Sequence, residues 1–520
     1  MNLRAAARFL PAWKNVLLAV LASVMLILAF PPFELWFTAW LALVPLLWAI
    51  EREGSVRRSF ILGWLFGNIF FLGTCWWLTF APITYAGFPT PLAYLLLFCV
   101  TSVAAIFPGL FSSITAFLLS RLGSVAFLAV PFVWVFTEFL RYWITGNNWN
   151  AIGYSQAFGG LQFFAKTGGV LAVSFSLMFA GSFIFASITR RRREGAAIVY
   201  AVPSVMTIAF FGFGPTLLDR SEPRPRFEDE PIRRVIAIQP NVPMSGLNYE
   251  RWGEFRRRHV RLAEAALATI DRNQGYIVVR PMVIFPESPM NFMYEDDPET
   301  KEFINRFAAK NNVSVLFNSA EPDASNGKYF NSAVLVGPDG VEAAQYDKIY
   351  LLPFGEAVPF PLGAVMPAFV GSFSYGKEYD LLPLGDAKAG VMICFESHFG
   401  QLSREYVRNG ADVIIEMTND GYLGPTPVLR QHLANAVFRA VETNRPVLRV
   451  TNVGITAYIN ERGEVLDAAE SYVEDTRVWS MAKSDGSQTF YVKSGDWFAW
   501  LCSILTLGLL IFGLVRRRTL

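Results

Sequence analysis

Long apolar runs occupy most of the first 220 residues of this chain, and one more lies close to its C-terminus. Each run is roughly as long as the 17 to 25 residues that a helix needs to cross the hydrocarbon core of a bilayer. The pattern therefore predicts an α-helical transmembrane bundle of eight spans. The predicted spans are residues 15–33, 36–50, 60–80, 91–120, 124–142, 168–189, 196–218 and 497–515.

The short polar segments between these runs carry unequal numbers of Lys and Arg residues. Basic clusters lie at the N-terminus, at residues 52–58, at Arg121, at residues 190–193 and at residues 516–518. With eight spans, all five clusters fall on the same side of the membrane, and positive charge resists translocation. The sequence thus predicts that both termini are cytoplasmic and that the segment from about residue 220 to about residue 490 is extracytoplasmic.

That outer segment opens with a Pro-rich charged linker and then alternates short apolar strands with amphipathic helices, which indicates a layered α/β domain. The predicted division is residues 1–219 for seven spans, 220–231 for the linker, 232–490 for the α/β domain and 491–520 for the eighth span with a basic tail. The expected strands are residues 235–239, 276–285, 313–318, 332–336, 389–395, 412–417, 447–452 and 456–460. The expected helices are residues 249–272, 300–311, 400–409 and 429–443.

The composition is typical of a membrane protein and argues against one class of partner, nucleic acid. Only 17% of the 520 residues are charged and 53% are hydrophobic, whereas soluble domains are about 25% charged. The formal net charge is +2, and the basic residues form short clusters beside apolar runs, so nucleic acid is not an expected partner. Membrane lipid is the expected solvent of the spans.

Four stretches of the outer segment place reactive side chains directly after apolar strands, where layered α/β folds usually hold their sites. They supply a carboxylate, a lysine followed by a second carboxylate, a thiol followed by a third carboxylate, and amides. The stretches are residues 284–288, 346–356, 391–396 and 417–420.

Cys394 is the one cysteine that lies outside the long apolar runs. A thiol with a pKa of about 8.5 is only partly ionised near neutrality, so thiol chemistry needs a base. Glu287 can take the proton, and the ammonium group of Lys348 can stabilise the oxyanion that forms when sulfur attacks an ester or amide. Each of the three has an ordinary structural explanation, as a small buried side chain, a helix cap or a solvated charge. Their joint occurrence predicts an acyl-transfer site.

Glu138 and Arg141 lie three residues apart near the end of the fifth predicted span, so they share a helix face and can pair. Ionisable residues inside a span are costly and are candidates for function. Two interpretations stay open: a contact with substrate, or a structural tie between the span and the following loop.

The histidines His259, His398 and His432 are too dispersed to predict a zinc site. The chain also lacks a Cys-x-x-Cys pair and a phosphate-binding glycine motif. We therefore expect neither a metal ion nor another cofactor.

Three of these stretches resemble the signatures of the nitrilase, or carbon–nitrogen hydrolase, superfamily: Phe-Pro-Glu287, Lys348 with Leu-Pro-Phe-Gly-Glu356, and Ile-Cys394-Phe-Glu396. The resemblance implies an αββα sandwich with a triad of Glu287, Lys348 and Cys394. Within the superfamily, the eight-span envelope and the outer domain resemble the apolipoprotein N-acyltransferase family. Residues 137–141 and 146–156 match that family too.

This resemblance implies a reaction in two steps. Cys394 takes an acyl chain from a phospholipid as a thioester, and then yields it to the α-amino group of the diacylglyceryl-modified N-terminal cysteine of an apolipoprotein. Glu287 acts as base in both steps, and Lys348 stabilises the oxyanions. Supporting or substrate-binding roles are implied for Glu356, Glu396, Asn331, Asn419, Tyr422 and Glu442. The implied location is the bacterial inner membrane, with a periplasmic catalytic domain in a monomer.

Two departures from the family pattern leave the preferred head group and acyl chain open. After Asn419 and Asp420 the family usually carries an aromatic pair that opens with Trp, whereas this chain has Gly421-Tyr422-Leu423. Tyr422 is expected to replace that Trp as the aromatic that faces lipid. Residues 247–249 read Leu-Asn-Tyr where the family has a Lys-Trp.

Two other functions stay as alternatives. A membrane-anchored amidase or nitrilase would resolve the thioester with water, and the triad by itself does not separate the two enzymes. A transporter or receptor would only bind a ligand with its outer domain. It would carry paired ionisable residues deep in several spans, and apart from Glu138 and Arg141 the spans are nearly free of them.

Overall fold

A computed structural model describes residues 10–146, 148–189, 233–273, 280–287, 289–290, 292–358 and 373–516 of the chain. The described residues form two compact units. We call the first the helical unit; it contains the residues up to 189, Thr426–Ala434, and the residues from Ser494 on. We call the second the α/β unit; it contains residues 233–425 and Asn435–Lys493. The predicted span at residues 196–218 and the linker at residues 220–231 lie outside the described residues.

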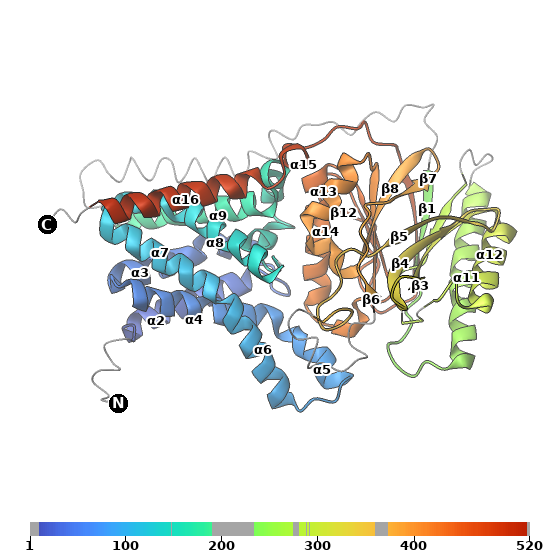
Figure 1. Cartoon of the computed structure of the whole chain (residues 1–520), viewed down its shortest axis with the longest axis horizontal. Coiled ribbons are helices and arrows are strands. Elements are labelled where there is room, and N and C mark those ends of the chain that lie inside the picture. The colour runs from blue at the N-terminus through green and yellow to red at the C-terminus, as the bar shows by residue number, and fades with distance from the viewer. Residues whose placement is uncertain are drawn as a thin grey trace. The chain divides into compact units, whose positions relative to one another are not determined.

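Apolar helices make up the helical unit, as Figure 1 shows. Within the described residues, four stretches are long and apolar enough to cross a membrane: Val56–Thr84, Thr90–Thr145, Leu161–Thr189 and Trp497–Val515. The helices are α2 (Trp13–Leu28), α3 (Ala39–Glu53), α4 (Val56–Cys75), α5 (Phe80–Thr84), α6 (Thr90–Ala104), α7 (Ile106–Leu122), α8 (Val130–Thr145), α9 (Ala165–Thr189) and α16 (Trp497–Val515). Helices α2 and α3 lie over the first two predicted spans but are shorter than typical membrane-crossing helices.

The run predicted as one span at residues 91–120 forms two helices, α6 and α7, which divide at Ala105. Pro108 lies in the first turn of α7 and has no N–H to donate to the carbonyl of Ala104. The apolar pattern continues through this break, so hydrophobicity does not reveal it.

Two sheets form the centre of the α/β unit. The first has the strand order β13-β1-β2-β3-β4-β5, with β6 beside β4, and the second has the order β12-β11-β10-β9-β8-β7. The strands of the first sheet are β1 (Arg233–Gln239), β2 (Met282–Ile284), β3 (Ser314–Asp323), β4 (Lys328–Val336), β5 (Glu342–Asp347), β6 (Phe373–Ser374) and β13 (Asp475–Met481). Those of the second are β7 (Leu381–Leu384), β8 (Ala387–Ile393), β9 (Val413–Thr418), β10 (Val447–Thr451), β11 (Ala457–Ile459) and β12 (Val465–Leu466).

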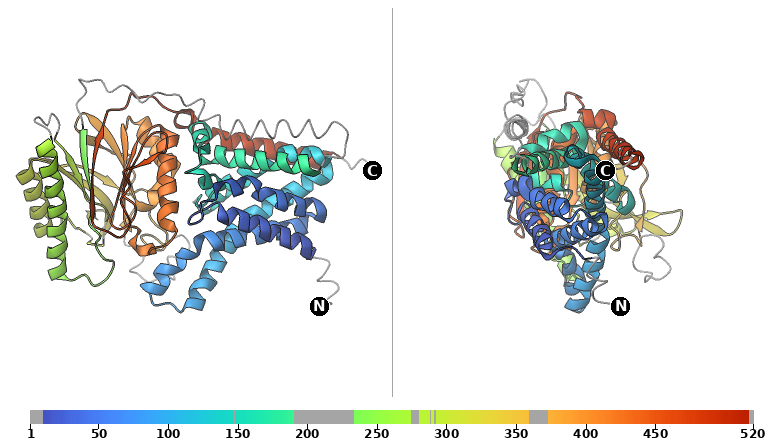
Figure 2. Two further views of the ribbon diagram at one scale, coloured as in Figure 1. Left: turned by 180° about the vertical axis from the view of Figure 1, so that it is seen from behind. Right: turned by 90° about the vertical axis from the view of Figure 1, so that its left-hand side faces the viewer.

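Helices cover the outer faces of the two sheets, as Figures 1 and 2 show. Helices α11 (Tyr249–Asn273) and α12 (Pro298–Asn311) lie on one side, and α13 (Gly400–Arg408) and α14 (Val428–Thr443) lie on the other. Side chains of α11 and α12 pack against those of β1 to β4 in one buried hydrophobic cluster. The layers therefore run helix, sheet, sheet, helix, which confirms the predicted αββα sandwich.

Sequence patterns located the central strands and missed the edge strands. The strand predicted at residues 389–395 is two residues too long at its C-terminal end, because Cys394 and Phe395 already belong to the 3₁₀ helix η7 (Cys394–His398). The prediction for residues 276–285 contains only three strand residues, and residues 276–279 lie outside the described part of the chain. The edge strands β5, β7, β12 and β13, together with the two-residue strand β6, have few buried apolar side chains and so lack a clear pattern.

Candidate active site

Three strand ends of the α/β unit bring Glu287, Lys348 and Cys394 into one site. Glu287 follows β2, Lys348 directly follows β5, and Cys394 directly follows β8. The carboxylate of Glu287 lies close enough to the thiol of Cys394 for its charge to act on it, and the charge of Lys348 acts on both. The structure thus assembles the three residues that the sequence proposed as a triad.

The backbone at Cys394 turns sharply as the strand ends. Its φ of 53° lies in the left-handed region, which costs energy for a residue with a side chain and is often found at functional sites. The N–H of Ile393 donates to the carboxylate of Glu396 at 2.9 Å, which holds the turn closed. Residues 391–393 are buried, whereas Cys394 is partly exposed, so the turn brings the thiol to the end of the sheet.

Glu287 is held by donors from two different elements. The backbone N–H of Asn419 donates to its Oε2 at 3.1 Å, and Asn331 Nδ2 donates to its Oε1 at 3.4 Å. Burial raises the pKa of Glu287, although the charge of Lys348 opposes the rise. Glu287 is therefore a stronger base than an exposed carboxylate and has its hydrogen-bond partners in place.

Lys348 is buried, with only 1% of its surface exposed, and its Nζ lies 2.9 Å from Glu356. Burial alone would lower the pKa of Lys348, but the carboxylates of Glu356 and Glu287 outweigh it and raise the pKa. The side chain therefore stays an ammonium ion near neutrality and can stabilise an oxyanion.

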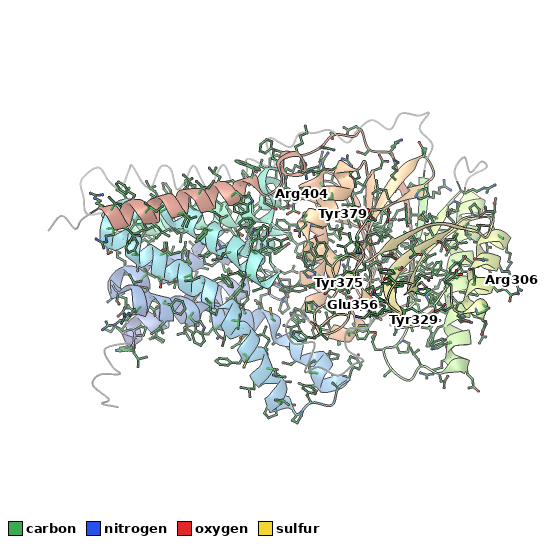
Figure 3. All side chains as sticks on the ribbon, viewed as in Figure 1. Arg306, Tyr329, Glu356, Tyr375, Tyr379 and Arg404 are labelled. Atoms are coloured by element: carbon green, nitrogen blue, oxygen red, sulfur yellow. The ribbon has the colours of Figure 1, made fainter. Side chains whose placement is uncertain are left out.

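Glu356 and Asn331 connect the lysine to the base. Glu356, which Figure 3 labels, accepts hydrogen bonds from Asn331 Nδ2 at 2.6 Å and from the N–H of Leu352 at 2.7 Å. Burial raises the pKa of Glu356, but Lys348 and these donors outweigh burial and lower it. Because Asn331 donates to both Glu287 and Glu356, one amide fixes the spacing of the two carboxylates.

Glu396 connects the turn at Cys394 with the segment that carries Lys348. Its Oε1 accepts hydrogen bonds from the N–H groups of Ile349 at 2.7 Å and Tyr350 at 3.0 Å, and from the hydroxyl of Tyr346 at 2.8 Å. Burial raises the pKa of this carboxyl to about 7. Tyr346 lies in a stretch that the sequence singled out, but its role was not predicted.

The thiol of Cys394 is protonated at rest. Burial and then the negative charge of Glu287 raise its pKa well above its usual value, while the charge of Lys348 opposes the rise. A neutral thiol beside a basic carboxylate can pass its proton to that carboxylate as sulfur attacks. Thr418, fully buried at the end of β9, was not predicted as a site residue.

The remaining predicted residues of this unit lie around the site. The Oδ1 atom of Asn419 accepts a hydrogen bond from Asn452 Nδ2 at 3.2 Å, which fixes the turn after β9. Tyr422, in the 3₁₀ helix η8 (Asp420–Leu423), is 47% exposed and is available to an apolar ligand. Glu442 pairs with Arg439 at 2.7 Å, and Arg439 donates to the carbonyl of Ser397 at 3.0 Å. Glu442 therefore supports the turn that follows Cys394.

Glu138 and Arg141 lie in the helical unit and connect α8 to the loop after it. Glu138 Oε1 accepts the N–H of Ile152 at 3.0 Å, and Arg141 donates to the carbonyl of Trp149 at 2.8 Å and to Asn148 Oδ1 at 3.0 Å. Both side chains are buried. Of the two interpretations left open above, these contacts support the structural tie.

A buried ion cluster behind the nucleophile was also missed by sequence reasoning. Arg449 of β10 contacts Glu416 of β9 and Asp420 of η8. A single charged residue inside each of two otherwise apolar strands was the signal that could have revealed it. Among the residues that the structure describes, no three His, Cys, Asp or Glu side chains are grouped to hold a metal ion.

Two family models match the chain. Residues 22–183 match the apolipoprotein N-acyltransferase N-terminal domain, and residues 237–486 match the carbon–nitrogen hydrolase domain. A solved structure of Saccharomyces cerevisiae Nit3, a member of branch 10 of the nitrilase superfamily, aligns with a TM-score of 0.37 and 17% identity, covering 48% of this chain and 90% of that chain.

Curated relatives extend over nearly the whole chain. The apolipoprotein N-acyltransferase of Geobacter metallireducens is 31% identical over 508 residues, covering 94% of this chain and 93% of the relative. That of Pasteurella multocida is 27% identical over 516 residues, covering 96% of each. That of Allorhizobium ampelinum is 31% identical over 493 residues, covering 89% of each. With both domains matched and a relative 31% identical over nearly the whole chain, this chain belongs to the apolipoprotein N-acyltransferase family.

Proposed function

We propose that this chain is a bacterial membrane N-acyltransferase that completes the acylation of lipoproteins. It moves an acyl chain from a phospholipid to the α-amino group of the diacylglyceryl-modified N-terminal cysteine of an apolipoprotein, through a thioester on Cys394. The observation that carries the proposal is that Glu287, Cys394 and the buried ammonium group of Lys348 meet at three strand ends, close enough for their charges to act on one another. Relatives that bear the name of this activity align over nearly the full chain.

In the first step, the thiol proton of Cys394 passes to Glu287 as Sγ attacks the ester carbonyl of the phospholipid. The resulting oxyanion is stabilised by the ammonium group of Lys348. The carbon–oxygen bond then breaks, and the leaving alkoxide takes the proton from Glu287. The products are a thioester and a lysophospholipid.

In the second step, the amine of the apolipoprotein attacks the thioester carbonyl and gives a proton to Glu287. Lys348 again stabilises the oxyanion, and the carbon–sulfur bond breaks. The sulfur of Cys394 regains its proton from Glu287, which leaves an amide product and the enzyme in its starting state.

Neighbouring side chains keep these three groups in position. Asn331 and Glu356 hold Glu287 and Lys348 at a constant spacing, and Glu396 joins the nucleophile turn to the lysine segment. Asn419 orients Glu287 through its backbone amide. We assign the exposed ring of Tyr422 to the acyl chain, the pair of Glu442 and Arg439 to support of the turn, and Glu138 with Arg141 to the loop after α8.

The proposed topology has eight spans, seven within residues 1–219 and one within residues 491–520, with a linker at 220–231. The catalytic domain, residues 232–490, lies in the periplasm of a monomer, and both termini lie in the cytoplasm. Two observations support this topology. The basic clusters lie in alternate loops, and the helical unit contains long apolar helices.

The test is intact mass spectrometry of the full-length protein after incubation with phospholipid. We expect a mass increase of one acyl chain that hydroxylamine removes, that a diacylated lipopeptide discharges as an N-acylated product, and that water discharges slowly. Cys394→Ala should abolish the adduct, whereas Cys99→Ala, a change at an exposed cysteine of the helical unit, should not.

A different pattern would support the alternative enzyme. If no adduct forms and the lipopeptide amine is never acylated, while small amides or nitriles are hydrolysed, the chain is a membrane-anchored hydrolase and the proposal fails.

A further inference from the structure

Arg449 is a fully buried cation in the middle of β10. Its Nη1 lies 2.5 Å from Glu416 Oε1 and its Nη2 lies 2.8 Å from Asp420 Oδ2. Both carboxylates are also buried, with at most 1% of each side chain exposed. The three side chains form a cluster with two negative charges and one positive charge in the interior of the α/β unit.

The backbone places this cluster between two strands and the turn that follows them. Arg449 and Glu416 are direct partners in the parallel pairing of β10 with β9. Asp420 opens η8 immediately after that strand. Gly454 approaches the carboxylate so closely that a Cβ there would lie 2.2 Å from Asp420 Oδ2, so the carboxylate has no room to move in that direction.

The cluster reaches the proposed catalytic groups by two routes. Asn419, the residue before Asp420, donates its backbone N–H to Glu287 Oε2 at 3.1 Å. The pairing of Ile393 with Met417 brings Cys394 beside Thr418 on the neighbouring strand. The negative charge of Asp420 and the positive charge of Arg449 both act on the thiol of Cys394.

The charged groups around the thiol come from several segments, and they include Glu396 of η7, two residues after Cys394, and Glu356, which pairs with Lys348. Glu287 follows β2, Lys348 follows β5, Asp420 lies in η8, and Arg449 lies in β10. Glu416 of β9 lies behind Arg449. Among these groups the cations are Lys348, which faces the site, and Arg449, which lies on the interior side.

We propose that Arg449 is a positioning residue that compensates the carboxylates behind Cys394 and fixes the turn carrying the Asn419 amide, so that the thiol can pass its proton to Glu287. This inference rests on the proposed role of Cys394 as nucleophile. Stability alone is a weak explanation, because apolar residues of similar volume often replace a buried ion cluster without loss of stability.

The experiment measures alkylation of Cys394 by iodoacetamide against pH in the full-length protein, with the labelled peptide quantified by mass spectrometry. Arg449→Met leaves two buried carboxylates uncompensated, so the midpoint of the profile should move up by about one pH unit and alkylation at pH 8 should fall about tenfold. Arg449→Lys, which keeps the charge, should recover most of the rate.

The double variant Arg449→Met with Asp420→Asn distinguishes an effect of net charge from an effect of the hydrogen bonds between the two residues. It has the same net charge as the wild type but none of the hydrogen bonds between these two residues. We expect its midpoint to return toward that of the wild type. A double variant as slow as Arg449→Met would overturn the proposal, as would an Arg449→Met profile equal to that of the wild type.

A second variant tests the proposal if Arg449→Met does not fold. If Arg449→Met loses its thermal unfolding transition, Asp420→Asn alone tests the same charge, because removing this carboxylate should move the midpoint down; no change would count against the proposal. Alkylation requires neither phospholipid nor lipoprotein. A wild-type protein that never forms a thioester would therefore overturn the proposed function while leaving the alkylation result intact.

Discussion

Burial disfavours the charged form of Lys348, Cys394 and Glu287, and neighbouring charges decide how each side chain ionises. Lys348 has two carboxylates beside it and remains an ammonium ion, whereas the negative charge of Glu287 acts on Cys394, which remains a thiol. The resting site therefore holds its nucleophile neutral and its electrophilic group charged.

Lys348→Met should slow formation of the thioester by about 10²- to 10³-fold, which is the effect of removing one oxyanion donor in other acyl-transfer sites. The rate is followed by intact mass spectrometry with phospholipid as donor. Lys388→Met, at an exposed lysine of β8, is the matched control and should leave the rate unchanged. A similar loss in both variants would show that Lys348 has no specific role.

Glu287→Gln should change acyl transfer and alkylation in opposite directions. The variant loses the base, so the thioester should no longer accumulate. It also loses the negative charge that helps to raise the pKa of the Cys394 thiol, so the pKa should fall and iodoacetamide alkylation at pH 8 should become faster. Slower alkylation in Glu287→Gln would contradict this account of the resting thiol.

Helix α11 packs against the first sheet with a buried histidine at the contact. His259 is fully buried, its Nδ1 lies 2.7 Å from the carbonyl oxygen of Phe255, and its ring packs edge-on against Phe285 with 4.9 Å between centroids. Burial lowers the pKa of His259 to about 4. The packing of α11 on this sheet therefore requires a neutral imidazole.

The stability of the α/β unit should accordingly fall in acid. The folded protein binds a proton at His259 only near pH 4, whereas the unfolded chain binds it near pH 6.5, so the contribution is complete above pH 6.5 and is lost as pH falls through about 4. The difference corresponds to about 3 kcal/mol. Thermal unfolding of the full-length protein in detergent micelles measures this loss.

His259→Leu should remove this part of the acid sensitivity, so that the difference in unfolding temperature between wild type and variant becomes smaller from pH 7 to pH 4. Phe292→Leu is a matched control from the same buried cluster. It should lower the unfolding temperature by a similar amount at every pH. Equal pH dependence in the wild type and in His259→Leu would contradict the prediction.

The two units of the molecule expose different kinds of surface. The helical unit exposes many large apolar side chains, including Leu95, Ile504 and Leu514, as a surface in contact with lipid does. The α/β unit buries a large apolar cluster between its helices and its first sheet, and it exposes fewer large apolar side chains. An enzyme that joins a lipid donor to a protein acceptor needs both kinds of surface.

The proposed topology is tested by labelling single cysteines with a membrane-impermeant maleimide in intact spheroplasts, in a variant that lacks the four native cysteines. Lys388→Cys, in the α/β unit, should react at once. Arg57→Cys, in a basic cluster of the helical unit, should react only after the membrane is permeabilised. Both positions are exposed, so burial does not explain a difference. The reverse pattern would invert the proposed topology.

Local patterns were sufficient for much of this protein. Apolar runs identify α4 and α16, because a helix in lipid must be apolar along its whole length. Buried central strands such as β8 and β9 read as short apolar segments. The positions of Glu287 and Cys394 followed from the predicted strands that precede them, whereas the strand before Lys348, β5, was missed. The division of α6 from α7 was missed, because hydrophobicity is continuous across it and the signal of the break is a single proline, Pro108.

Residue type and short-range spacing are enough to predict the long apolar helices, the central strands and the side chains of the proposed chemistry. They do not reveal which distant segments meet in the folded protein. The tertiary structure pairs β1 with β13, more than two hundred residues later in the chain, and it brings Arg449 to Asp420 and Tyr346 to Glu396. These contacts depend on how the two sheets stack and on which strands become neighbours, and no local pattern encodes either choice.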